Sequence, residues 1–429
     1  FKKGPDYIDP MWLSAAANRD CYNLDFYTMQ HSEIMDKFQS STTGSDLSLI
    51  EGNKGLYDGL DLDGKNSNAA LAKLLQTPVI LVIDARGMTR GIAPLILGYQ
   101  SFDPEVNIAG IILNQLGGSR HESKLRSVIE HYTDLSVIGA VHRKPELEIK
   151  ERHLGLMPSN ESTIANKQIR QLGKHIAEQV DIGTVINIAS TTKAVASDIN
   201  QANHLDVSPT KAEKVKIGII RDAAFGFYYP DDLYRFKQLG VEIININLLT
   251  DTELPVIDGL FIGGGFPETQ MQTLENNKSM RKSVKSAINN GLPCYAECGG
   301  LMYLSDSLSW NDKTYKMAGV ITAQIKMHKK PQGRGYIQVE HTGKQLWTVS
   351  NEQISAHEFH YSSIETLSDT YQFAYKVNRG AGIDGEHDGI IYKNTLACYA
   401  HLKDTKQSPW VEQFVQFMHQ CKKNEVRES

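Results

Sequence analysis

Short, uninterrupted runs of branched apolar residues constrain the fold of this chain more than any other feature. The run Val-Ile-Leu-Val-Ile at 79–83 is followed by Asp84, and the run at 108–113 is followed by Asn114. Unbroken runs of this kind are typical of strands that are buried on both faces of a parallel sheet. Each run ends in a polar side chain, as expected where a strand reaches a ligand site.

Helical patterns fill the intervals between these runs, for example at 123–131. A third apolar run, at 47–50, leads into Glu51 and is predicted to be another strand. Strands that alternate with helices favour a doubly wound α/β sheet, which binds ligands at the carboxyl ends of its strands.

The chain divides into two α/β halves. Its 429 residues suggest two or three domains at roughly 150 residues each. After a polar stretch, new apolar runs occur at 215–220, 259–262 and 292–296. We therefore predict a first domain at 1–189, a linker at 190–213 and a second domain at 214–429.

Composition excludes several classes of protein. A hydrophobic content of 41% and a charged content of 22% are ordinary for a soluble globular chain. The net charge of -5, without a basic block, argues against nucleic-acid binding. No apolar run reaches 18 residues, so no membrane span is expected. Five scattered cysteines do not form a disulfide framework, and we expect a reducing, cytoplasmic location.

The strongest local motif lies at 293–301, Pro-Cys-Tyr-Ala-Glu-Cys-Gly-Gly-Leu. An apolar run ends at Cys298, and Gly299 and a second glycine precede a helical pattern, which is the pattern of a nucleophile elbow. A thiol at a helix N-terminus is expected to have a lowered pKa. Taken alone, the motif is equally compatible with a buried structural cysteine.

Two further segments favour the catalytic interpretation. Gly263, Gly264 and Gly265 end another strand, and their backbone N–H groups suit an oxyanion hole. His401 ends a late apolar run and suits a general base for the thiolate.

Together these segments resemble the class I glutamine amidotransferase domain, in the variant found in the cobyric and cobyrinic acid amidating synthases. The segment His-Glu-Phe-His-Tyr-Ser at 357–362 matches that variant closely. The resemblance covers about 215–405 and implies that Cys298 attacks the amide of L-glutamine while His401 moves the proton. Ordinary class I domains have a glutamate two residues after the histidine. Lys403 stands there in this chain, so no acid is assigned to His401.

Acidic motifs dominate the first half. Asp6 and Asp9 lie three apart in a proline-flanked loop, and Glu51 precedes a glycine-rich turn that includes Asp58. Such carboxylates suit Mg²⁺, although Asp and Gly also favour turns for local reasons.

These strings, with Glu-Arg-His-Leu-Gly-Leu at 151–156, resemble the N-terminal domain of the cobyrinic acid a,c-diamide synthase family. That domain is a P-loop ATPase of the dethiobiotin-synthetase type. The resemblance implies that Glu51 coordinates Mg²⁺ and that Asn114 lies near the adenine of ATP. It also implies a site near metal, phosphates or macrocycle carboxylates for Asp6, Tyr7, Asp9 and Asp58.

The phosphate-binding motif G-x-x-x-x-G-K-[ST] is absent from the sequence. In the family it lies upstream of Gly-Pro-Asp-Tyr-Ile-Asp-Pro, and this chain begins at Phe1 in mid-motif. We therefore expect a form that lacks the first strand and the P-loop, with weak ATP binding.

The combined expectation is amidation of a tetrapyrrole-derived polycarboxylate that consumes ATP and glutamine. Cobyrinate is the first substrate candidate, with sirohaem or nickel-sirohydrochlorin as alternatives, and a homodimer is left open. A nucleotide-binding partner module without catalysis is the rival from another class. The paired Cys298 and His401 argue against it, because a binding module needs no thiol elbow.

Overall fold

The computed structural model describes residues 1–149, 151–152, 155–161, 165–192, 214–344, 346–347, 353–368 and 370–428. The chain forms two compact units, Phe1–Gln201 and Ala202–Ser429. The division falls inside the predicted linker at 190–213, of which 193–213 lie outside the described residues. The predicted domain boundaries themselves stay a prediction.

The first unit contains seven helices among its described residues, together with short and long strands. The helices are α1 (Ile8–Ala17), α2 (His31–Thr42), α3 (Asn68–Leu75), α4 (Ile92–Phe102), α5 (Ser119–Tyr132), α6 (Ala165–Ala177) and α7 (Ile182–Ser190). The strands are β1 (Lys2–Lys3), β2 (Asn23–Leu24), β3 (Val79–Asp84), β4 (Ile108–Leu116), β5 (Val137–His142), β6 (Glu151–Arg152) and β7 (Gly155–Leu156). Two 3₁₀ turns are η1 (Pro145–Leu147) and η2 (Ser159–Glu161).

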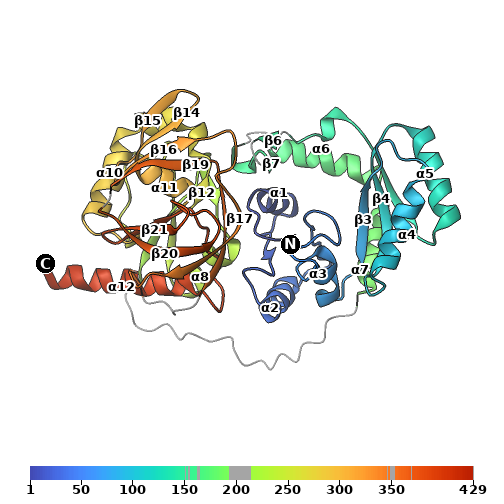
Figure 1. Ribbon diagram of the computed structural model, residues 1–429, viewed down its shortest axis with the longest axis horizontal. Helices are drawn as coiled ribbons and strands as arrows, with labels where there is room; N and C mark the ends of the chain where they lie inside the picture. The colour runs from blue at the N-terminus through green and yellow to red at the C-terminus, as the bar shows by residue number, and fades with distance from the viewer. Residues whose placement is uncertain are drawn as a thin grey trace. The chain divides into compact units, whose positions relative to one another are not determined.

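The two clearest apolar runs form the centre of the first unit, as the sequence predicted. Strands β3, β4 and β5 form a parallel sheet in that order, with Asp84 opposite Asn114 at its carboxyl edge. Helices α4 and α5 cover one face through a core that includes Ile96, Leu113 and Leu125 (Figure 1). On the other face of the sheet, Gly110 of β4 has no side chain, which leaves room for Ile188 of α7. The crossover helices α4 and α5 thus cover only one face, and Val82 of β3 is 59% exposed, so the expectation that this strand is buried on both faces is wrong.

The predicted strand at 47–50 is wrong. The described backbone there is irregular, and its only pairing is a bridge from Glu51 to Lys2 of β1. Leu47 and Leu49 are exposed rather than buried between two faces. The segment runs beside β1, but its hydrogen bonds to Phe1 and Lys3 make one isolated bridge rather than a ladder.

The second unit contains five helices and fifteen strands among its described residues. The helices are α8 (Pro230–Gln238), α9 (Met271–Asn276), α10 (Lys278–Asn289), α11 (Gly299–Leu304) and α12 (Trp410–Glu428), with a 3₁₀ turn η3 (Pro267–Thr269). The strands up to the site are β8 (Lys216–Ile220), β9 (Phe225–Phe227), β10 (Glu242–Ile246), β11 (Gly259–Ile262), β12 (Gly264–Gly265) and β13 (Cys294–Glu297). The later strands are β14 (Ser305–Trp310), β15 (Lys313–Lys316), β16 (Ile321–Met327), β17 (Gly333–His341), β18 (Ile354–His360), β19 (Ser362–Leu367), β20 (Gln372–Arg379), β21 (His387–Tyr392) and β22 (Thr395–Cys398).

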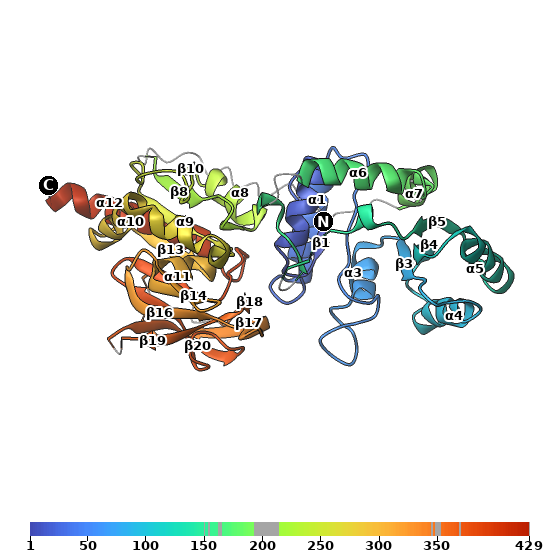
Figure 2. The same cartoon turned by 90° about the horizontal axis from the view of Figure 1, so that it is seen from above.

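A nine-stranded mixed sheet organises this unit, in the order β10-β8-β11-β13-β22-β21-β20-β17-β18. The strands from β10 to β22 are parallel, and those from β21 to β18 are antiparallel. Figure 2 shows β8 and β10 at one end of the unit and β17, β18 and β20 at the other. A second sheet, β15-β14-β16-β19, packs beside it. The predicted runs at 215–220, 259–262 and 292–296 correspond to β8, β11 and β13.

Successive side chains of the central strands point alternately into two hydrophobic cores, one on each face of the sheet. Leu260 and Ile262 of β11 belong to the core on the α10 and α11 side, whereas Phe261 belongs to the core under α8 and α12 (Figure 1). In β13, Cys294 faces α11 and Tyr295 faces α12. Burial on both faces is typical of a three-layer α/β sandwich.

None of the helices in the described part of the chain combines the length and the apolar character that a membrane span requires.

Candidate active site

The turn from β13 into α11 carries Cys298. Its backbone has φ 46° and ψ -98°, an unusual conformation for a residue with a side chain. Cys298 N–H donates to Cys398 O at 2.7 Å, which ties the turn to the neighbouring strand β22. A strained backbone at the nucleophile is a known feature of nucleophile elbows. The predicted elbow is therefore present in the backbone geometry.

Gly300 explains why the elbow needs a second glycine. A Cβ atom there would lie 2.2 Å from the carbonyl oxygen of Ile262 in β11. We expect Gly300→Ala to lower the free energy of unfolding by about 1–3 kcal/mol, because the backbone of the elbow must move to accept the methyl group. Urea unfolding followed by circular dichroism measures this.

Gly98 supplies the matched control for that substitution. It lies in helix α4, and no atom lies within 4 Å of a Cβ built there. Gly98→Ala should raise stability by about 0.5–1 kcal/mol. An unchanged or stabilised Gly300→Ala variant would contradict the close packing of the elbow.

His401 and the glycine segment reach the elbow from the adjacent strands. Strand β13 pairs with β22, with Glu297 opposite Cys398, and His401 follows β22 by three residues. A Cβ on Gly264 would lie 2.6 Å from His401 Cε1. The carboxyl ends of β11, β13 and β22 therefore bring the predicted thiol, histidine and glycines to one edge of the sheet.

The backbone N–H groups around the thiol are not equivalent. A Cβ on Gly299 would lie 3.0 Å from the nitrogen of Gly265, so these two glycines are neighbours. Gly299 also directs its N–H to the Cys298 sulfur. Gly263 does not fit the oxyanion prediction, because its N–H already donates to Tyr228 Oη at 2.9 Å. Gly265 and Gly299 are the better candidates.

The thiol is not activated in the resting site. Burial raises the pKa of Cys298, the Glu268 carboxylate adds to this, and the Gly299 N–H only partly opposes it. The lowered pKa expected from the helix N-terminus is not found, because desolvation of a thiolate outweighs a single backbone donor. Burial and the nearby His360 lower the pKa of His401 to about 3. A neutral imidazole beside a neutral thiol is the starting state.

Sequence reasoning missed the carboxylate nearest to His401. Glu297 Oε2 lies 3.4 Å from His401 Nδ1, and both side chains are buried. Lys403, at the position of the usual acid, instead pairs with Asp231 at 2.6 Å and lies 4.5 Å over the Tyr229 ring. The sequence held one signal for this role: Glu297 directly precedes the thiol. Because it follows Tyr295 by two residues in a strand, it lies on the same face of β13 as Tyr295.

The segment 357–362 forms the third wall of the site. Strand β18 carries His357, whose ring stacks on His401 at a centroid distance of 4.9 Å. Phe359 O accepts a long contact of 3.8 Å from Cys298 Sγ. Glu358 accepts the N–H groups of Ala381 and Gly382 at 2.6 and 2.8 Å, so this carboxylate fixes a loop. The motif thus shapes the surroundings of the thiol.

In the first unit, Asp9 and Glu51 meet at a lysine that sequence reasoning did not single out. The buried Lys2 Nζ lies 2.6 Å from Asp9 Oδ2 and 3.4 Å from Glu51 Oε2. Asp6 Oδ1 accepts the N–H groups of Ile8 and Asp9 at the start of α1. Burial and the charge of Asp9 raise the pKa of Asp6 to about 6. Three carboxylates thus crowd a single ammonium group.

Glu51 and Asp9 fit a Mg²⁺ ion that takes its other ligands from phosphate and water. No cluster of three or more His, Cys, Asp or Glu side chains placed to hold a metal is found in the described ranges. Mg²⁺ is commonly held by one or two carboxylates together with phosphate oxygens and water. Glu51 and Asp9 supply hard oxygen donors of this kind, and a cation would relieve the repulsion that raises the pKa of Asp6.

The remaining predicted residues lie elsewhere in the first unit. Tyr7 is buried at the start of α1. Asp58 is exposed, and its Oδ2 accepts the Gly55 N–H at 3.0 Å within its own turn. Asn114 lies at the carboxyl edge of β4 and accepts the Gln115 N–H. No contact in the described residues joins Asp58 or Asn114 to Asp6, Asp9 and Glu51, so their predicted roles stay predictions.

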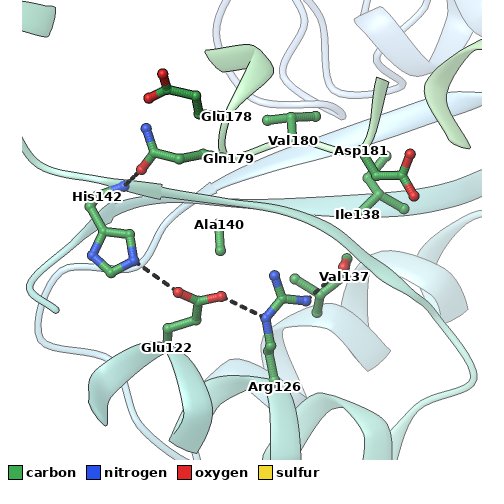
Figure 3. Close-up of a pocket in the computed structure, with 10 residues that line it drawn as sticks. All are labelled: Glu122, Arg126, Val137, Ile138, Ala140, His142, Glu178, Gln179, Val180 and Asp181. Carbon is green, nitrogen blue, oxygen red and sulfur yellow. Dashed lines mark hydrogen bonds and ion pairs between the residues drawn. The ribbon is translucent and has the colours of Figure 1, made fainter. Parts of the chain in front are cut away.

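A cavity of about 670 Å³ lies beside β5 and α5 (Figure 3). Its polar groups bind one another: Glu122 contacts both His142 and Arg126 at 2.8 Å, and Gln179 accepts the His142 N–H. The cavity includes none of the predicted site residues. We assign it no role in the reaction.

Both units of the chain match known domain families. Residues 216–407 match the CobB/CobQ-like glutamine amidotransferase domain, and residues 5–151 match an AAA domain. The chain thus combines a nucleotide-binding α/β domain with a glutamine amidotransferase domain, and the predicted fold class is confirmed.

Curated relatives extend this over almost the whole chain. "Cobyrinate a,c-diamide synthase" of Magnetococcus marinus is 42% identical over 97% of this chain and 90% of its own length. The proteins of the same name from Archaeoglobus fulgidus and Methanosarcina acetivorans are 37% and 38% identical, over 97% and 94% of this chain and 89% and 85% of their own lengths. This chain belongs to the cobyrinate a,c-diamide synthase family, whose members are glutamine-dependent amide-forming ligases.

Proposed function

We propose that this protein amidates the a and c acetate side chains of cobyrinate, using L-glutamine as nitrogen donor and ATP as energy source. The observation that supports this most strongly is the meeting of Cys298, His401 and Gly265 at one sheet edge in a chain of this family. Sirohaem and nickel-sirohydrochlorin remain alternative substrates. The proposal places the enzyme in the cytoplasm and is compatible with a homodimer.

The first half-reaction releases ammonia from glutamine. His401 takes the proton from Cys298, and the thiolate attacks the side-chain amide carbon. Negative charge develops on the amide oxygen within reach of the Gly265 and Gly299 N–H groups. His401 then gives its proton to the leaving nitrogen, so that ammonia departs and a γ-glutamyl thioester forms. Water hydrolyses the thioester to glutamate and restores the thiol.

The second half-reaction activates the acetate carboxylate. A free carboxylate does not accept ammonia, so one of its oxygens attacks the γ-phosphate of ATP, giving an acyl phosphate and ADP. Ammonia then displaces phosphate and leaves the carboxamide. Glu51 and Asp9 would hold Mg²⁺, which when bound neutralises charge on the transferred phosphoryl group. Lys2 supplies a further positive charge beside these two carboxylates.

Substrate competition tests the proposal. Purified full-length protein is incubated with ATP, Mg²⁺ and glutamine, and with cobyrinate, sirohaem or nickel-sirohydrochlorin in separate reactions. Mass spectrometry follows the loss of about 1 Da for each carboxylate that becomes a carboxamide. We expect two such steps on cobyrinate, with ATP hydrolysis in step with each. Amidation of only one of the other macrocycles would overturn the substrate assignment and keep the reaction type. ATP-independent glutamine hydrolysis alone would overturn the ligase.

A further inference from the structure

We propose that Glu297 orients His401 for proton transfer and so completes a Cys-His-Glu triad from the residue that directly precedes the nucleophile. This deepens the proposed function and rests on it. The site otherwise lacks an assigned acid, because Lys403 occupies the position two residues after the histidine. Glu297 acts through His401, so it is a positioning residue.

The contact geometry supports this role. Glu297 Oε2 lies 3.4 Å from His401 Nδ1, and we assign the other ring nitrogen, Nε2, to the proton of the Cys298 thiol. The other carboxylate oxygen accepts the Tyr295 hydroxyl at 2.6 Å and the Leu402 N–H at 2.9 Å. Catalytic contacts are often long before substrate binds and shorten in the complex. The two fixed donors hold the carboxylate while its free oxygen faces the imidazole.

The neighbouring Lys403 cannot take over this task. Its ammonium group pairs with Asp231 and lies over Tyr229, and a cation at Nδ1 would repel the imidazolium that forms during proton transfer. Glu358 is also buried near His401, but its two oxygens accept the Ala381 and Gly382 N–H groups. Glu297 is therefore the carboxylate that contacts the Nδ1 side of the ring in the described residues.

The protonation state of Glu297 controls the imidazole tautomer. A carboxylate accepts Nδ1–H and leaves Nε2 free to take the thiol proton, whereas a protonated carboxyl donates to Nδ1 and moves the ring proton to Nε2. Burial raises the pKa of Glu297 to about 8, and Tyr295 and Leu402 partly oppose this. The fraction of protein with an ionised Glu297, which is the active form, therefore increases as the pH rises through about 8.

Other titratable groups face Glu297 from the elements packed around it. They are Tyr295 on β13, Tyr375 on β20, Cys398 on β22, Cys298, His401, Tyr228 and Asp232. Burial raises the pKa values of the tyrosines, the cysteines and Asp232, so the tyrosines and cysteines stay neutral near pH 8. Asp388 and Asp404, also buried nearby, have pKa values of about 6, lower than that of Glu297.

Glu297→Gln tests the proposal. The amide keeps the size of the side chain but donates to Nδ1, which fixes the unproductive tautomer. We expect the kcat of glutamine hydrolysis to fall at least about 10²-fold, with the KM for glutamine within threefold of wild type. The rise of activity through about pH 8 should disappear. Ammonia-dependent amidation should stay within threefold of wild type, which shows that the variant is folded.

Tyr295→Phe provides a second, milder test. It keeps the carboxylate and removes one donor that lowers the pKa of Glu297. Turnover at high pH should stay within threefold of wild type, while the rising limb of the pH profile moves up by about one pH unit. A purely structural role for Glu297 would not move that limb.

The outcomes separate the proposal from the function on which it rests. A wild-type protein that hydrolyses no glutamine overturns the proposed function. A Glu297→Gln variant that keeps more than a third of wild-type glutaminase overturns only the triad. If Glu297→Gln also loses ammonia-dependent amidation, it has not folded, and the Tyr295→Phe profile decides. An unshifted limb in Tyr295→Phe overturns the triad.

Discussion

Cys298→Ser should lower glutamine-dependent amidation by about 10³-fold or more while ammonia-dependent amidation stays close to wild type. A serine hydroxyl has a far higher pKa than a thiol, and the buried site already raises the pKa of Cys298. With its pKa lowered to about 3, His401 is too weak a base to remove the proton of a hydroxyl at a useful rate. Ammonia supplied in solution avoids this step. Both activities are measured on one preparation with the same macrocycle.

Cys294 provides the matched control. It lies on β13, the strand that leads into the elbow, it is fully buried, and it faces the core beside α11 rather than the edge that carries the elbow. Cys294→Ala should keep both activities within threefold and cost about 1 kcal/mol of stability through a small cavity. A Cys298→Ser variant that still uses glutamine at a third of the wild-type rate would contradict the nucleophile assignment. The assignment would also be contradicted if Cys294→Ala lost glutamine-dependent amidation but kept ammonia-dependent amidation.

The sequence predicted the parts of the fold that depend on local pattern. Continuous apolar runs became β3, β4, β8, β11 and β13. Strands β8, β11 and β13 are buried along almost their whole length and have no polar position to interrupt the run, whereas Val82 of β3 is exposed. The elbow could also be predicted from local pattern, because only a glycine at position 300 lets the backbone lie this close to the carbonyl oxygen of Ile262. The run at 47–50 failed because a pattern does not reveal how far two neighbouring segments pair, and here only Glu51 bridges to β1.

The parts that could not be predicted depend on register between distant segments. Glu297 reaches His401 because β13 and β22 pair with Glu297 opposite Cys398, a relation that no local spacing encodes. Gly263 looked equivalent to its two neighbours until Tyr228 proved to accept its N–H. Lys2 lies between Asp9 and Glu51 because Glu51 bridges to β1 across 49 residues of sequence. Such contacts follow from topology rather than from residue type.

The second large effect should come from Glu51→Gln. We expect a loss of about 10²–10³-fold in amidation with either glutamine or ammonia, because both routes need the activated carboxylate. Glutamine hydrolysis should persist, since its residues belong to the other unit. If Glu51 holds Mg²⁺, the variant should also need a higher Mg²⁺ concentration for half-maximal activity. Amidation rates measured across a Mg²⁺ series with each nitrogen source provide the comparison.

Glu105→Gln separates a metal role from the simple loss of an ion pair. Glu51 lies 3.4 Å from Lys2 Nζ, and the exposed Glu105 lies 3.3 Å from Lys73 Nζ in the same unit. Both substitutions remove one carboxylate from a lysine, but only Glu51 belongs to the carboxylate group with Asp6 and Asp9. Glu105→Gln should leave amidation within twofold, because exposed ion pairs contribute little. Ammonia-dependent amidation that survives in Glu51→Gln with an unchanged Mg²⁺ requirement would rule out a metal ligand at Glu51.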